Sequence, residues 1–289
     1  MAMTQETTAH ESTIRTRSAS PLAALDEEHR ASTEALSVPG TGLALPRVSV
    51  VMPTLNEAKN LPLVIARIPG WVHEIIIVDG RSTDATPAVA LALSPKARIV
   101  LETKPGKGAA LRAGFRGASG DIIAMLDADG SMDPAELIMF VGTLISGADF
   151  AKGSRFVQGG GTTDMSFYRM LGNWCLTQIV RVLYGSTFSD LCYGYNAFWA
   201  QKLSALNVDR DGFEIETAMN ISAIRSGLNV AEVPSFESPR VHGVSNLRPI
   251  SDGFRVLSTI LREWTRPKRA GVRWPTTAPN TAPQRPTTV

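Results

Sequence analysis

Short apolar runs alternate with segments of helical spacing through the first half of the central chain. Four runs rich in Val and Ile predict strands, and helical patterns follow each of them. Such units in a row predict an α/β fold, a mainly parallel sheet covered by helices on both faces. The predicted strands are 47–53, 73–79, 97–102 and 121–127, and the predicted helices begin after Asn60, after Asp84, at Gly108 and after Asp133.

Several helix starts carry recognisable capping residues. Asp84 is placed to cap the second helix. In the fourth, Asp133 is the expected cap, Pro134 takes the first helical position, and Glu136 completes a capping box. The local sequence therefore predicts where these helices begin.

Two tails flank the patterned region. Residues 1–45 lack a periodic apolar face, and residues 267–289 are dominated by Pro, Thr and Arg, so both are predicted to be disordered. The 46–266 segment is long enough for one sizeable core and is predicted to be a single domain.

The charge of the chain argues against a nucleic-acid partner. The net charge is +2, and residues 46–263 carry 21 basic and 21 acidic side chains. A nucleic-acid protein needs a basic face that displaces counterions from phosphates. Binding of nucleic acid is therefore not expected.

The cysteines and the apolar runs bear on location. Cys175 and Cys192 are too few for a disulfide framework or a four-ligand zinc site, which favours a reduced, cytoplasmic setting. No run has the length of a signal peptide core or of a membrane span. We expect a chain that is not exported and does not cross a bilayer by itself.

Polar residues follow each predicted strand. They occupy 54–57, 79–84, 104–108 and 127–129. In an open parallel sheet the loops at the carboxyl ends of the strands converge, and ligands bind there. The four loops therefore predict one binding cleft.

Three of these loops bear on the chemistry of the cleft. Asp127 and Asp129 supply the hard oxygen donors that a divalent cation prefers, although an acidic pair alone is also typical of a solvated turn. The basic loop 104–108 matches neither phosphate-binding template and suits an anionic ligand or a surface turn equally. Asp79, at the end of its strand, is placed to accept hydrogen bonds from a base or ribose.

Seven motifs in order resemble family 2 nucleotide-sugar glycosyltransferases of the GT-A fold, especially the dolichyl- and polyprenyl-phosphate sugar transferases. The similarity runs from about Val48 to Leu261. The motifs are VVMPTLNE (50–57), IIIVDGRSTDAT (75–86), KPGKGAAL (104–111), DADGSMDP (127–134), GSR (153–155), DLCYGYNAF (190–198) and RVHGVSNL (240–247).

The resemblance implies a role for each matching residue. It implies a nucleotide pocket lined by Pro53, Glu57, Asp79 and Lys107, with Asp127 and Asp129 holding Mg²⁺ or Mn²⁺ against the diphosphate. It also implies that Arg155 and Arg240 contact phosphates of donor or acceptor, as forked guanidinium groups do well. Gly80, Ser131 and Asn246 depart from the family pattern, which leaves the donor sugar and base open.

The acceptor decides whether a base is needed. The resemblance implies inverting transfer of a hexose to a polyprenyl phosphate, which is already anionic near neutral pH. A hydroxyl acceptor would instead need a carboxylate, from Asp190, Glu214 or Glu216, and Glu216 is also a candidate substrate contact. A nucleotidyltransferase would need a Gly-rich first loop, which is missing, and a non-catalytic nucleotide-sugar binding module stays open.

The last predicted helix has two interpretations. Between Ser251 and Arg266, six large apolar residues form a stripe with arginines nearby, which suits peripheral contact with the inner face of a membrane or with an integral membrane partner. Packing of the same stripe on the sheet is as plausible. The segment 174–183, apolar at helical spacing, is interpreted as core.

Overall fold

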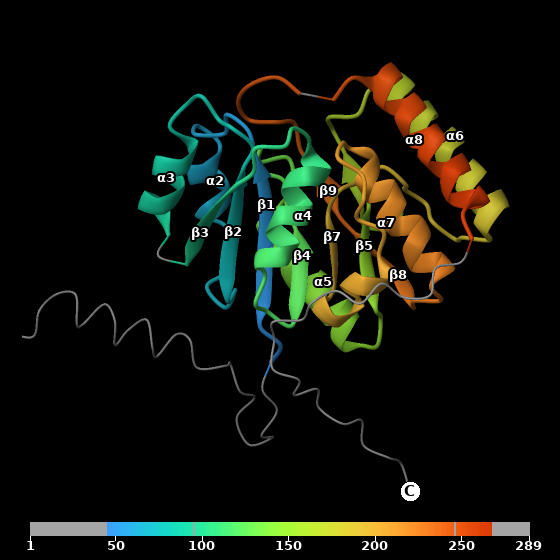
Figure 1. Ribbon diagram of the computed structural model, residues 1–289, viewed down its shortest axis with the longest axis horizontal. Helices are drawn as coiled ribbons and strands as arrows, with labels where there is room; N and C mark the ends of the chain where they lie inside the picture. The colour runs from blue at the N-terminus through green and yellow to red at the C-terminus, as the bar shows by residue number, and fades with distance from the viewer. Residues whose placement is uncertain (1–44, 95, 246, 268–289) are drawn as a thin grey trace, which may run out of the picture. The chain divides into compact units, whose positions relative to one another are not determined.

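The computed structural model describes residues 45–94, 96–245 and 247–267. Seven strands form one sheet in the order β3-β2-β1-β4-β7-β5-β8 (Figure 1). The predicted tails and Asn246 lie outside the described residues, apart from positions 45 and 267, so the disorder and the domain limits stay predictions. The strands are β1 (Val48–Thr54), β2 (Glu74–Asp79), β3 (Ala97–Leu101), β4 (Ile122–Met125), β5 (Phe150–Ser154), β7 (Asn196–Trp199) and β8 (Val230–Pro234).

The sheet is mainly parallel, as predicted. β1 pairs in parallel with β2 and β4, β2 with β3, and β5 with β8. Only β7 runs the other way in this sheet, antiparallel to both β4 and β5. The predicted α/β class and all four predicted strands are confirmed, whereas β5, β7 and β8 add a second half that the apolar pattern does not predict.

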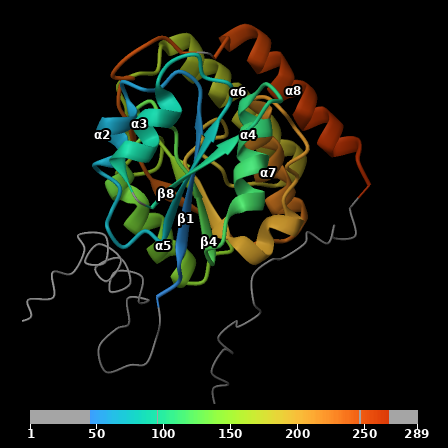
Figure 2. The ribbon, with the colours of Figure 1, turned by 60° about the vertical axis from the view of Figure 1, so that its left-hand side comes forward.

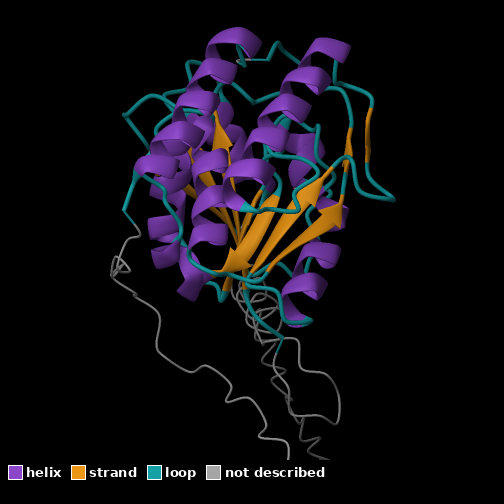
Figure 3. Cartoon of the chain, turned by 90° about the vertical axis from the view of Figure 1, so that its right-hand side faces the viewer, coloured by secondary structure: helices purple, strands orange, loops and turns teal. Residues whose placement is uncertain are grey.

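Helices cover both faces of the sheet, which Figure 3 shows as a layer of strands between helices. α2 (Leu61–Ile65), α3 (Thr86–Leu93) and α5 (Leu137–Ile145) lie on one side of β1, and α4 (Lys107–Gly117) and α7 (Glu214–Arg225) on the other (Figure 2). Alternation along β1 explains this arrangement, because Val50 and Met52 join one buried cluster and Val51 joins the other.

Two further helices extend the fold beyond the sheet. α6 (Phe167–Tyr184) and α8 (Pro249–Thr265) lie side by side (Figure 1) and share a third apolar cluster with α7. The Tyr184 hydroxyl donates to the Ile260 carbonyl over 2.6 Å, which joins the two helices near their ends. A two-stranded parallel ribbon, β6 (Gly161–Thr162) with β9 (Phe236–Glu237), completes this side.

The fourth predicted helix begins differently from the expectation. Asp133 does cap it, accepting the Ala135 N–H over 2.9 Å, but the first turn, Pro134–Glu136, is a 3₁₀ helix. Glu136 does not complete a capping box, because its carboxylate instead accepts the distant Phe236 N–H over 3.0 Å. A tertiary contact has therefore replaced a local one.

Candidate active site

A cleft of about 660 Å³ lies where the predicted loops converge. Residues from the loops after β1, β2, β3 and β4 line it, together with residues of α6, α7 and α8. Asp79 and Asp190 do not line it. The predicted site residues that do are Pro53, Glu57, Lys107, Asp127, Asp129, Arg155, Glu216 and Arg240.

Lys107 ties together two carboxylates on the cleft wall. Its ammonium lies 2.7 Å from Asp127 Oδ1 and 2.6 Å from Glu216 Oε1. Burial alone would lower the pKa of Lys107, but attraction to Asp127 and Glu216 outweighs it and raises the pKa. Burial also raises the pKa of Glu216, which Lys107 only partly offsets.

Arg240 forms a second ionic centre beside the first. Its Nη2 lies 2.9 Å from Asp129 Oδ2, and its Nη1 donates to Glu57 Oε1 over 2.8 Å. Burial opposes its charge, but these carboxylates raise the pKa of Arg240. Together Glu57, Lys107, Asp127, Asp129 and Arg240 make up what we call the charged side of the cleft.

The acidic pair sits in a tight turn rather than on an extended strand. β4 ends at Met125, and Gly130 follows Asp129 with a φ of 80°, a conformation that glycine adopts most readily. Asp129 Oδ1 accepts the Ser131 N–H over 2.9 Å, which fixes one oxygen and leaves Oδ2 toward Arg240.

The chemistry of this pair fits a hard divalent cation. The side chains of Asp127 and Asp129 are 26% and 16% exposed, and both line the cleft. Within the described residues no group of three or more His, Cys, Asp or Glu could hold a metal. Two carboxylates are enough for Mg²⁺ or Mn²⁺ when substrate phosphates and water supply the other oxygens.

Asp79 is placed to hold its own loop. It is 4% exposed, and its two carboxylate oxygens accept the Ser82 N–H over 3.3 and 3.2 Å. The residues that follow it, Gly80 and Arg81, line the cleft instead. A direct contact of Asp79 with a nucleotide stays a prediction.

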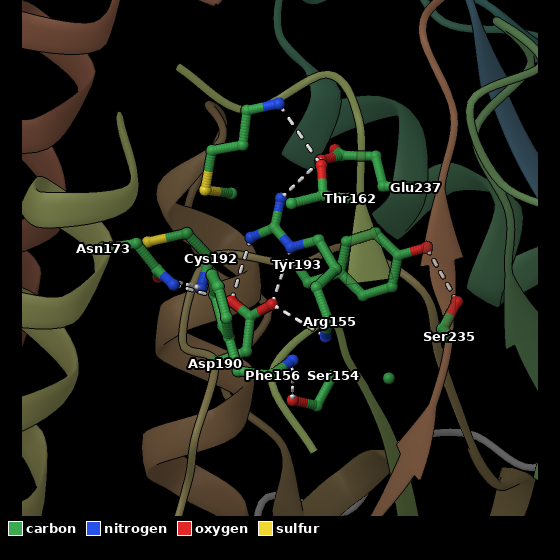
Figure 4. A network of polar contacts seen from close by, with 12 residues as sticks. Ser154, Arg155, Phe156, Thr162, Asn173, Asp190, Cys192, Tyr193, Ser235 and Glu237 are labelled. Atoms are coloured by element: carbon green, nitrogen blue, oxygen red, sulfur yellow. Dashed lines mark hydrogen bonds and ion pairs between the residues drawn. The ribbon is translucent and has the colours of Figure 1, made fainter. Parts of the chain in front are cut away.

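Asp190 is fully buried in a network around Arg155 (Figure 4). Arg155 Nε and Nη2 donate to its two oxygens over 2.7 and 2.9 Å, and Nη1 donates to Glu237 over 2.9 Å from the opposite side. Asn173 of α6 also donates to Asp190, over 3.0 Å. Arg155 thus meets the cleft with its guanidinium already paired to two carboxylates.

Helices α6 and α8 supply a different lining. Arg169, Asn173 and Asp252 give this lining some polar groups. Five aromatic, aliphatic or glycine residues lie beside them: Tyr168, Gly172 and Leu176 from α6, and Gly253 and Val256 from α8. A Cβ added to Gly172 or Gly253 would meet no atom within 4 Å, so this lining borders open space. These five residues make up what we call the apolar side of the cleft.

Glu214, the 174–183 segment and two further polar residues lie in places that the sequence did not predict. Glu214 is not among the residues that line the cleft. The assignment of 174–183 to the core was wrong at Trp174 and Val182, which are 58% and 82% exposed. No sequence pattern singles out Arg169, which lines the cleft from α6, or Glu237, whose partner Arg155 is distant in the chain.

Comparison with known proteins shows which family this chain resembles. The family described as "Glycosyl transferase family 2" matches residues 49–205. A polyprenol monophosphomannose synthase of Mycolicibacterium smegmatis is 35% identical, over 72% of this chain and 84% of that protein. An undecaprenyl-phosphate mannosyltransferase of Micrococcus luteus is 32% identical, over 65% and 82%.

Solved structures agree on the fold. Glucosyl-3-phosphoglycerate synthase of Mycobacterium tuberculosis, crystallised with Mn²⁺, UDP and glucosyl-3-phosphoglycerate, is similar with a TM-score of 0.61. It is 26% identical, and the similarity covers 77% of this chain and 81% of that one.

Proposed function

Because this chain belongs to glycosyltransferase family 2 and is a glycosyltransferase, we propose that it moves a hexose from a nucleoside diphosphate sugar to a polyprenyl phosphate, with inversion and with Mg²⁺ or Mn²⁺. The observation that supports this most is that one cleft has both a charged and an apolar side. A water-soluble donor and a lipid acceptor require both.

The charged side suits the donor. Asp127 and Asp129 would hold the cation, which when bound neutralises negative charge on the departing diphosphate. Lys107 and Arg240 would release or share their carboxylate partners as the diphosphate enters, and so add positive charge close to it. The UDP and Mn²⁺ in the glucosyl-3-phosphoglycerate synthase structure support this division of roles.

The acceptor oxygen attacks the anomeric carbon from the face opposite the diphosphate. One carbon–oxygen bond forms, the bond to the diphosphate breaks, and its electron pair leaves with the nucleotide. An ionised phosphate needs no base. This agrees with the carboxylates available, because Asp190 is buried against Arg155, Glu216 is paired with Lys107, and Glu214 is not on the cleft wall.

The apolar side suits the lipid. α6 and α8 also carry large apolar side chains on the surface, among them Leu171 (46% exposed), Trp174 (58%), Phe254 (69%) and Leu261 (51%). On α6 and α8 these residues recur at helical spacing, and Arg255 is 63% exposed beside them. Such helices bind anionic bilayers at their surface. None of the helices in the described part of the chain combines the length and apolarity needed to span a bilayer.

A transfer assay tests the proposal. The full chain is incubated with MnCl₂, vesicles containing a polyprenyl phosphate, and a panel of radiolabelled nucleoside diphosphate sugars, in which GDP-mannose is included because of the relatives' names. We expect one donor to give a chloroform-soluble product that chelation abolishes. Label that moves only to 3-phosphoglycerate or another water-soluble acceptor would favour the hydroxyl-acceptor alternative.

A further inference from the structure

Arg81 differs from the other cations of the cleft. The cleft is lined by five Lys or Arg side chains, and four of them pair with carboxylates. Within the described residues, Arg81 has no such partner and no hydrogen bond to its guanidinium, and it is exposed to the cleft. The four pairs are Lys107 with Asp127 and Glu216, Arg155 with Asp190 and Glu237, Arg169 with Asp164, and Arg240 with Glu57 and Asp129.

The backbone of Arg81 is also unusual. Its φ is 71°, in the left-handed region that disfavours side chains other than Gly, Asn and Asp. Asn56 is the other described non-glycine residue with a positive φ, and asparagine is among the residues that adopt it readily; its Oδ1 also accepts the Thr83 N–H from the loop after β2 over 2.8 Å. No comparable contact of Arg81 explains why arginine occupies this position.

The sheet order says which part of a donor Arg81 can reach. Arg81 follows β2, the acidic pair follows β4, and β1 lies between these strands. Neighbouring strands are about 4.8 Å apart, so the two loops are separated by about 10 Å along the sheet edge. Because the proposed lipid acceptor takes the part of the cleft lined by α6 and α8, the nucleoside of a diphosphate held at Asp127 and Asp129 is left with the part lined by the loops after β1 and β2.

We infer that Arg81 is a specificity residue whose guanidinium contacts the nucleobase of the donor. A planar, permanently charged guanidinium can stack on a base and donate to its carbonyl oxygens, whereas lysine offers only a point charge. The inference rests on the proposed function, because it takes the donor to be a nucleoside diphosphate sugar bound through its diphosphate at the acidic pair.

Nucleotide binding by the full-length chain tests this inference. Calorimetry with MnCl₂ first identifies which of UDP, GDP, ADP, CDP and dTDP binds the wild type most tightly. For Arg81→Asn we expect the Kd of that nucleotide to rise about tenfold, equivalent to about 1.4 kcal/mol, while the Kd of inorganic pyrophosphate stays unchanged. Asparagine tolerates the left-handed backbone, so the thermal midpoint should not fall.

Two further variants sharpen the test. Arg81→Lys keeps the charge but loses the planar group, so we expect the Kd to stay raised. Arg116→Asn removes another exposed arginine, on α4, that does not line the cleft, and we expect no change in the Kd. Wild-type affinity in Arg81→Lys, or an equal loss for pyrophosphate in Arg81→Asn, would overturn the base contact.

Failure of the proposed function looks different. A wild-type chain that binds none of the five nucleotides overturns the proposed function and this inference with it. A wild type that binds one of them, together with an Arg81→Asn variant that binds it as tightly and with the same preference among bases, overturns only the inference.

Discussion

The two sides of the cleft are built in different ways. The charged side is made of side chains from the loops that follow β1 and β4, from the start of α4 and from the segment before α8, and its residues neutralise one another in pairs. The apolar side is made of two helices that pack on α7 through one stripe and leave another stripe exposed. The paired charges of the first side fit the proposed nucleotide donor, and the exposed helix faces beside the second fit the proposed lipid acceptor.

The largest effect is expected on the charged side. Asp129→Asn removes one proposed cation ligand and one partner of Arg240, so we expect turnover in the transfer assay to fall about 10²–10³-fold. Asp121→Asn is the matched control, because Asp121 precedes β4 and pairs with Arg47 at the surface. A variant with full turnover, or an equal loss in the control, would contradict the role given to Asp129.

The network around Arg155 connects α6 to the cleft wall, and breaking it should affect stability. Asp190→Asn leaves a buried arginine with one carboxylate, which we expect to cost about 3 kcal/mol or more in the free energy of unfolding. Urea denaturation at pH 7 measures this change in the free energy of unfolding. Asp121→Asn, which breaks an exposed pair, should cost less than about 1 kcal/mol.

The buried pair of Asp190 and Arg155 predicts that the stability of the fold depends on pH. Burial opposes ionisation of Asp190, but hydrogen bonds and charge from Arg155 hold its pKa below the usual 3.8. As the pH falls, the Asp190 carboxylate is protonated in the unfolded chain before it is protonated in the folded chain. The excess in free energy of unfolding of wild type over Asp190→Asn should therefore be complete above about pH 5 and shrink as the pH falls below 3.8. An advantage that grows on acidification would be inconsistent with this buried ion pair.

The exposed apolar stripe of α8, next to the apolar side of the cleft, should respond to an added charge. Phe254→Asp removes a 69% exposed ring from α8, and we expect binding to anionic vesicles to fall about tenfold in a flotation assay, without loss of nucleotide binding. Ile138→Asp, at a 58% exposed position on α5, is the control. Equal loss in both variants would argue against a membrane surface at α8.

The two cysteines offer the mildest test. Cys175 is exposed on α6, whereas burial raises the pKa of Cys192 to about 12. Because the thiolate is the reactive form, a maleimide at pH 8 should modify Cys175 faster than Cys192, which lines the cleft. Anionic vesicles should slow this labelling. Fast modification of Cys192, or labelling of Cys175 that vesicles leave unchanged, would count against the assignment of the two sides.

The sequence predicts the charged side well because its residues follow strands that are recognisable by their apolar runs. It predicts β1 to β4 but not β5, β7 or β8, since FAKGS, NAFW and VAEVP lack long Val and Ile runs. It does not predict that Asp190 is buried against Arg155 or that Glu136 accepts the Phe236 N–H, because these partners are far apart in the chain. Trp174 and Val256 share helical spacing with core residues, so periodicity cannot tell which face is exposed.

The chemical structure of the product tests the central claim most directly. The lipid formed from the active donor is purified and analysed by ³¹P NMR, mass spectrometry and proton coupling at the anomeric carbon. We predict a phosphodiester that links the sugar C1 to the prenyl phosphate, with the anomeric configuration opposite to that of the donor. A product in which the prenyl phosphate is still a monoester and the sugar is attached to a hydroxyl, or in which the configuration is retained, would contradict it.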